Sequence, residues 1–454
     1  MTRLLPLTFL LGLFLSANAQ QDFFGPYELA DTSELFTYLD TLEAQSTRAV
    51  DSTYRSYVAD YLGTRTEIIK GAVLDSSLVF APEVMASVDQ VLQRIIEANE
   101  LDVSPRAFIA RNPKINAASL GDGLFLVNVG LLKSVTSERG LAFVLSHELA
   151  HDQLDHAGAS MLSRATRAKE YDEEVEAWNE LSRRKRRRQI RSMRRNGERM
   201  GPSMTEIRDL IYANKRHSRA NEVAADSLGM QYLLAAGYDR TAGFDALGNF
   251  YSERLVLPVG TAAKLLTTTD HPFDPAWTEA PTTMFGGSFG GASEAGFWRH
   301  DSLRTHPDLG LRIELLALAV DSTKVPSPHG HTQWAQREIL NSYLYEHQPA
   351  HALVMAMRGL VDEGADEAPD FYYAMAARSL LEVVRAIDER YFDKAIPPSK
   401  YFPDPGVSEV TLFLQNATRN DFWQLANGII TEQLIHHPTS AHLLSAQEEL
   451  TSYK

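Results

Sequence analysis

Residues 147–151 read His-Glu-Leu-Ala-His, which places two imidazoles one helical turn apart with a carboxylate between them. Residues at i and i+4 lie on one face of a helix, so His147 and His151 can reach one metal ion while Glu148 points toward a water beside it. This spacing is typical of a catalytic zinc site and predicts metal-assisted hydrolysis. The same five residues also occur by chance on exposed helices, so the surrounding sequence has to decide between the two.

The residues before this motif predict the buried helix that a metal site requires. Residues 141–145 are apolar and contain neither Gly nor Pro, and Ser137-Glu138 is a typical helix start. On a buried helix, a His-Glu-His trio without partners would be costly to desolvate. The flanking sequence therefore favours a metal-binding helix over an exposed one.

A second acidic pair offers the remaining ligand. Glu222 and Asp226 again stand at i and i+4, on a predicted helix that ends near Gly237. A catalytic zinc takes three protein ligands and leaves one position open, so we expect Glu222 to bind the metal. Asp226 would accept a hydrogen bond from the far nitrogen of a ligating histidine. Taken alone, this stretch is equally compatible with an amphipathic helix whose acids are solvated.

Three separated stretches together resemble peptidase family M48, the zinc metalloendopeptidases that include HtpX-like and periplasmic BepA-like members. The stretches are residues 116–155, residues 221–226, and Thr305-His306-Pro307 followed by Arg312. The resemblance implies an α+β fold, with a mainly helical, gluzincin-type zincin domain and a small sheet. It assigns one zinc ion to His147, His151 and Glu222, the general base to Glu148, and supporting catalytic roles to Asp226, His306 and Arg312.

His306 keeps two interpretations under this resemblance. It is either a fourth metal ligand in a closed form or an oxyanion donor in an open form, and a surface His-Pro turn is the alternative. The glycine-rich residues 285–293 precede it and predict a loop, either a lid over the metal or a plain linker. A His₂-Glu ligand set also accepts cobalt or manganese in vitro.

The sequence upstream of the motif indicates where a polypeptide would bind. Residues 116–123 read as a turn and residues 124–129 as an apolar, β-prone run. In a peptidase of this kind the run resembles the edge strand to which a substrate backbone adds as a further strand. We therefore expect Asn116, Ala117, Leu124 and Leu126 to contact an extended, unfolded substrate. An interior strand without a free edge is the alternative.

The remaining sequence predicts the domain organisation. Residues 1–19 read as a secretory signal peptide, residues 20–78 as an N-terminal helical segment, residues 79–325 as the peptidase domain and residues 326–454 as a helical C-terminal domain. Apolar spacing in that last domain resembles degenerate tetratricopeptide-type repeats or a simple bundle. The chain has no cysteine, which excludes disulfides and a lipid-modified cysteine. We expect a soluble, exported protein, periplasmic or secreted, with no transmembrane helix and no lipid anchor.

Charge is unevenly distributed along this acidic chain of formal net charge −15. Most of the basic run Arg183–Arg199 belongs to a predicted charged helix over residues 159–196, which we expect to project near the mouth of the active site. It could contact an anionic membrane surface, capture acidic substrates or touch nothing. Nucleic acid is not expected as a partner, because no aromatic residues interleave with the arginines.

These observations predict a zinc-dependent endopeptidase that cleaves misfolded or unassembled exported proteins. Its C-terminal helices could bind an outer-membrane or assembly-machinery protein. The alternative is a chaperone-like or assembly scaffold in which the zinc site stays closed. A purely structural zinc would not require Glu148 and usually recruits cysteines, so the residues favour catalysis.

Overall fold

The structure is a computed structural model that describes residues 29, 31–135, 137–180, 185, 204–243, 246, 256–279, 312, 314, 316, 332–361, 369–398 and 404–453. Several sequence predictions therefore lie outside the described residues. They concern the signal peptide, the basic run apart from Lys185, the glycine-rich loop at 285–293, and His306.

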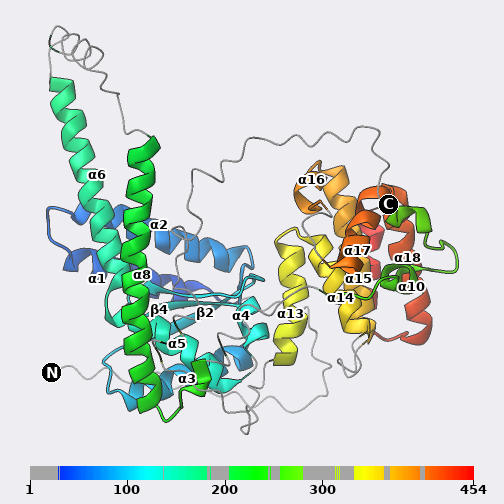
Figure 1. Cartoon of the computed structure of the whole chain (residues 1–454), viewed down its shortest axis with the longest axis horizontal. Coiled ribbons are helices and arrows are strands. Elements are labelled where there is room, and N and C mark those ends of the chain that lie inside the picture. Colours follow the sequence, from blue (N-terminus) through cyan, green and yellow to red (C-terminus); the bar gives the residue numbers. More distant parts are fainter. Residues whose placement is uncertain are drawn as a thin grey trace.

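A four-stranded sheet forms the centre of the first half of the chain (Figure 1). Its order is β1 (Leu78–Val79), β2 (Arg106–Ala110), β4 (Leu124–Asn128) and β3 (Ala117–Gly121). β2 runs parallel to β4, whereas β1 and β3 are antiparallel to their neighbours. β3 is therefore an edge strand and β4 is an interior one.

The prediction that residues 124–129 form the edge strand is wrong. Leu124 pairs with Arg106 of β2 on one side and with Gly121 of β3 on the other, and Leu126 is likewise enclosed by both neighbours. Apolar, β-prone residues specify a strand buried on its faces, but they do not specify its place in the sheet. The edge is formed by residues 117–121, four of which are small and which read as a turn in the sequence.

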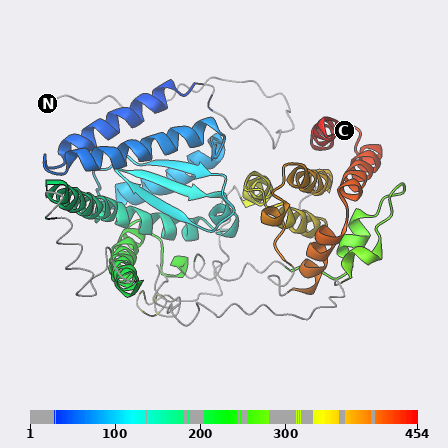
Figure 2. The same ribbon diagram turned by 90° about the horizontal axis from the view of Figure 1, so that it is seen from above.

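Helices cover both faces of the sheet (Figure 2). α1 (Ser33–Ala49) and α2 (Arg55–Leu74) pack on one face, where Leu35, Leu39 and Ile69 share a core with Phe108 and Leu124. On the opposite face, alternate strand residues such as Ile109 and Phe125 join the core that contains α3 (Pro82–Ala98) and α5 (Glu138–Gln153). The helical N-terminal segment thus belongs to the same packed unit as the sheet.

α5 carries the His-Glu-x-x-His motif, and its predicted start is confirmed. The Ser137 side chain accepts a hydrogen bond from the Gly140 amide at 3.1 Å, which satisfies one amide of the first turn. α5 contacts α3, β3 and α8 (Met204–Ala235). α8 ends just before Gly237, whose positive φ of 83° suits the residue after a helix. α6 (His156–Glu180) follows α5, and both α6 and α8 extend away from the sheet (Figure 1).

The C-terminal helices pack around α15 (Pro369–Asp388), which is buried along most of its length. The helices that contact it are α13 (Thr332–Tyr345), α14 (Pro349–Val361), α16 (Phe392–Ala395), α18 (Arg419–His436) and α19 (Ala441–Ser452). α17 (Pro405–Asn416) packs on α14, and the short α10 (Thr261–Leu266) and 3₁₀ helix η1 (Pro275–Thr278) lie against α17. The predicted helical C-terminal region is confirmed, and its likeness to tetratricopeptide repeats stays a prediction.

The two halves of the chain meet where α13 packs on α4 (Val129–Ser134). Near this contact the Arg111 guanidinium donates to the Glu338 carboxylate at 2.8 Å, and the Glu338 side chain is almost fully buried. The predicted α+β, mainly helical fold with a small sheet is confirmed. Among the described helices, none combines the length and the apolar character needed to cross a bilayer.

Candidate metal centre and active site

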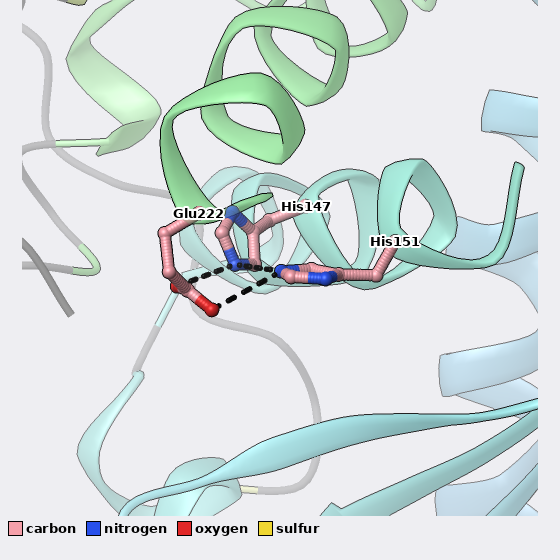
Figure 3. A group of neighbouring side chains, drawn as sticks. All are labelled: His147, His151 and Glu222. Atoms are coloured by element: carbon pink, nitrogen blue, oxygen red, sulfur yellow. Dashed lines mark hydrogen bonds and ion pairs between the residues drawn. The ribbon is translucent and has the colours of Figure 1, made fainter. Parts of the chain in front are cut away.

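The three predicted ligands meet at one point, although Glu222 comes from a different helix (Figure 3). The Nε2 atoms of His147 and His151 lie 3.1 Å apart. Each of them lies 3.5 Å from one carboxylate oxygen of Glu222. His147 and Glu222 are buried, and His151 is partly buried. The spacing within each helix and the packing of α5 on α8 therefore produce a single cluster.

This cluster fits a zinc ion. Four ligands at zinc–ligand distances near 2.0–2.1 Å form a tetrahedron whose ligand atoms lie about 3.3 Å from one another. The three separations between the candidate ligand atoms, 3.1, 3.5 and 3.5 Å, match that edge length without any movement of the side chains. Two imidazole nitrogens and one carboxylate are also the donor set of catalytic zinc sites that keep a fourth position open.

A buried carboxylate supports the first ligand from behind. Asp226 Oδ1 lies 2.8 Å from His147 Nδ1, which leaves Nε2 of that ring facing the other ligands. The Asp226 carboxylate also accepts from Arg312 Nε at 2.8 Å and from a second guanidinium nitrogen, so the pair is bidentate. Asp226 thus lies where the sequence placed it. Arg312, which was expected in a catalytic role, contacts Asp226 and holds that carboxylate.

Electrostatics in the metal-free cluster follow from this burial. Desolvation lowers the pKa of His147, but Asp226, Glu222 and Glu148 outweigh it and raise that pKa to about 9. Burial raises the pKa of Asp226, but the contacts with His147 and Arg312 are stronger and bring it below its usual value. A metal ion bound by His147 would displace the proton that this raised pKa favours, because a ligating imidazole is neutral.

The Glu148 carboxylate is held by the sheet. Its Oε2 accepts a hydrogen bond from the backbone amide of Ser119, in the edge strand β3, at 2.8 Å. The Asn116 carbonyl accepts a hydrogen bond from the Asn128 amide of β4 at 3.0 Å. Backbone groups of successive residues in a strand point to opposite sides, so the amide and carbonyl of the next residue, Ala117, point away from β4 toward the free edge of β3. The candidate general base is thus fixed against the strand that a substrate would join.

A cavity of about 930 Å³ opens between these elements. Its lining includes the metal ligands, Glu148, and the predicted substrate contacts Asn116 and Ala117. Leu124 and Leu126 do not line it, because both belong to the interior strand β4; Leu126 instead borders an apolar pocket against α2. The expectation that these two leucines contact substrate in this cavity is therefore wrong. His306 lies outside the described residues.

Sequence reasoning missed three residues that shape this site. His156 Nδ1 lies 2.9 Å from His151 Nδ1 and so contacts the far nitrogen of the second ligand. Asp152 accepts from the Gly123 amide at 3.0 Å and so attaches the β3–β4 turn to α5. Gly229 allows close packing of α8 on α5, since a Cβ there would lie 2.9 Å from His147 Cα. A histidine five residues after His151 and a glycine inside a helix were both visible signals.

Two comparisons with known proteins agree with this geometry. The model of peptidase family M48 matches residues 82–320, which is more than half of the chain. The mitochondrial metalloendopeptidase OMA1 of Bos taurus is 37% identical over 76 residues, covering 16% of this chain and 14% of that relative. The similarity therefore spans only a small part of the relative's length. The family match contains both helices of the metal cluster, and the chain belongs to peptidase family M48.

Proposed function

We propose that the protein is a zinc-dependent metalloendopeptidase with one zinc ion per chain, held by His147, His151 and Glu222. The observation that carries the proposal is the position of Glu148, whose carboxylate lies beside the ligand cluster and against the free edge of β3. A site that only stabilised the fold would not require an acid in that position. Membership of family M48 supports the same activity.

The chain's own residues divide the work of peptide hydrolysis. The Ser119 amide orients the Glu148 carboxylate, which takes a proton from the attacking water and later delivers it to the leaving amine. Asp226 and Arg312 hold the His147 ring with Nε2 toward the site. When bound, zinc supplies Lewis acidity that polarises the scissile carbonyl and acidifies water.

Substrate binding uses the edge strand. An extended polypeptide pairs with the amide and carbonyl of Ala117 as an added strand, a mode that requires an unfolded segment and depends little on its sequence. We therefore propose unfolded polypeptides as the substrates. The finer assignment is an exported protein, periplasmic or secreted, that cleaves misfolded or unassembled exported proteins. It rests on the signal-like residues 1–19 and on the shape of the site.

The test is proteolysis of unfolded casein by the full chain. Cleavage should stop with a chelator and return with zinc. Glu148→Gln should retain zinc, because that side chain is not a ligand, and should lose cleavage by several orders of magnitude. His147→Ala should lose both zinc and cleavage. A wild-type protein that binds zinc but cuts no unfolded substrate would point instead to a scaffold with a closed site.

A further inference from the structure

One wall of the active-site cavity is a single stripe of α6. The residues of α6 that line the cavity include His156, Ser160, Ser163, Arg164 and Arg167. Spacings of four, seven, eight and eleven from the first residue keep all five on one face of a helix. α6 begins beside the candidate metal ligands, because His156 contacts His151. The stripe therefore leads from the ligands outward along the cavity.

The outer part of this wall is cationic. Arg164 and Arg167 are exposed, and the Arg164 guanidinium lies 5.8 Å from the centre of the Tyr61 ring. Within the described part of the chain, neither arginine forms an ion pair with a carboxylate. The acids that line the cavity, Glu148 and Glu222, belong to the reaction centre at its inner end. The two arginines therefore give the outer part of this cavity a positive charge, although the formal net charge of the whole chain is −15.

The distance to the metal suits a polypeptide that lies along the cavity. Arg164 and Arg167 stand about 12 and 16 Å along the helix axis from His156, at a rise of about 1.5 Å per residue. An extended peptide advances about 3.3 Å per residue. For a segment that leaves the edge of β3 and continues along α6, both guanidinium groups therefore face a position roughly four or five residues from the bond at the ligand cluster. The Ser160 and Ser163 hydroxyls lie between and can bond to the peptide.

From this placement we infer that Arg164 and Arg167 form a subsite for acidic side chains of the substrate. The inference rests on the proposed peptidase function and narrows its substrate class to unfolded segments that carry a glutamate or aspartate four or five residues from the cleaved bond. Arginine suits this role because its planar guanidinium pairs with a carboxylate through two parallel hydrogen bonds. Two cationic side chains at a fixed distance from the ligand cluster would select where along a substrate such an acidic segment lies.

Two matched peptide series test the subsite. The substrates are uncharged, fluorescence-quenched peptides in which a pair of glutamates is placed at successive positions along the sequence. Peptides with a pair of glutamines at the same positions serve as the reference. For one position of the glutamate pair, the wild-type enzyme should show a kcat/KM about two- to thirty-fold higher than for the matching glutamine peptide. This range is expected for two exposed charge pairs, and the gain should come mainly from a lower KM. Arg164→Gln with Arg167→Gln should remove that preference, and Arg164→Glu with Arg167→Glu should transfer it to a lysine pair.

Lys169→Gln is the control variant, because Lys169 lies on the same helix but pairs with Glu173 and does not line the cavity. It removes a positive charge close to the two arginines and should leave the preference intact. Anisotropy of labelled peptides on zinc-loaded Glu148→Gln measures the same preference without turnover, so the result does not depend on catalysis. Equal affinity for the glutamate and glutamine series would overturn the subsite, whereas absence of cleavage by the wild type would overturn only the peptidase function.

Membrane contact is the competing use of these arginines. If the double glutamine variant loses binding to phosphatidylserine vesicles while the wild type treats both peptide series equally, the arginines serve a lipid surface and the subsite is refuted. If the double glutamine variant binds vesicles as the wild type does but loses the preference for one position of the glutamate pair, the subsite stands.

Discussion

Replacement of Gly229 by alanine tests whether the close approach of α8 to α5 sets the metal geometry. An added Cβ would lie 2.9 Å from His147 Cα, 2.9 Å from the Ser146 carbonyl oxygen and 3.0 Å from the His147 amide nitrogen, where ordinary contact begins at 3.4 Å. All three are backbone atoms of α5, so no side chain can rotate away. The helices must separate by about half an ångström.

Glu222 lies two turns before Gly229 on the same helix, about 10 Å away. A displacement of half an ångström exceeds the tolerance of roughly 0.2 Å in zinc–ligand distances. We expect Gly229→Ala to weaken zinc binding about 10- to 100-fold, the range seen when supports of a ligand are lost. The metal-free protein should lose about 1–3 kcal/mol from overpacking, partly offset by the roughly 1 kcal/mol better helix propensity of alanine.

Zinc competition against a chromogenic chelator measures the affinity, and urea unfolding of the metal-free protein measures the stability. Gly71→Ala is the control, because that glycine also lies within a helix, α2, and an added Cβ there meets no atom within 4 Å. It should keep wild-type zinc affinity and gain about 0.4–1 kcal/mol. If Gly229→Ala binds zinc as the wild type does and is no less stable, then close packing of these helices does not position Glu222.

Three further substitutions test the side chains that hold the metal ligands and the general base, and a buried lysine elsewhere in the fold. Asp226→Asn should lower zinc affinity about 10- to 100-fold, because it weakens the hold on His147; unchanged affinity by competition titration would contradict this. Asp152→Ala should leave zinc content unchanged but reduce kcat about tenfold on casein, since it frees the turn that aligns the Ser119 amide, and a wild-type kcat would argue against that role. Burial, together with nearby Arg358, lowers the pKa of Lys133 from 10.5 to about 8. The unfolded chain then holds more protons between those values, so stability should rise from pH 8 to 10.5, and Lys133→Met should flatten that rise in urea unfolding.

The ligands could be predicted from sequence because each pair is local. His147 with His151, and Glu222 with Asp226, are fixed by the geometry of one helix each, and the packing of the two apolar faces then brings them together. The place of a strand in its sheet is not local in this way. Residues 124–128 are more hydrophobic than residues 117–121, which indicated a buried strand. Hydrophobicity did not indicate that this strand has a neighbour on each side and that residues 117–121 form the edge of the sheet.

A second reason is that part of the site consists of backbone groups. The groups that hold Glu148 and Asp152 include the amides of Ser119 and Gly123, and a backbone amide has no signature in the sequence. The turn that presents them requires positive φ at Gly121, Asp122 and Gly123, and the Gly-Asp-Gly sequence did indicate a turn there. The Gly-Asp-Gly sequence did not indicate that this turn packs against α5.

α5 therefore has two functional faces, offset by one residue. His147 and His151 face α8 and meet Glu222. Glu148 and Asp152, also at i and i+4, accept hydrogen bonds from the Ser119 amide of β3 and from the Gly123 amide of the β3–β4 turn. One face fixes the metal and the other fixes the base relative to the strand that a substrate would extend. Because both pairs belong to one helix, the spacing of their backbones is fixed, and the side chains are held in place by groups on α8, on β3 and on the turn after β3. Changes in this site must therefore come from α8 or from the β3–β4 turn, which are the elements that Gly229→Ala and Asp152→Ala disturb.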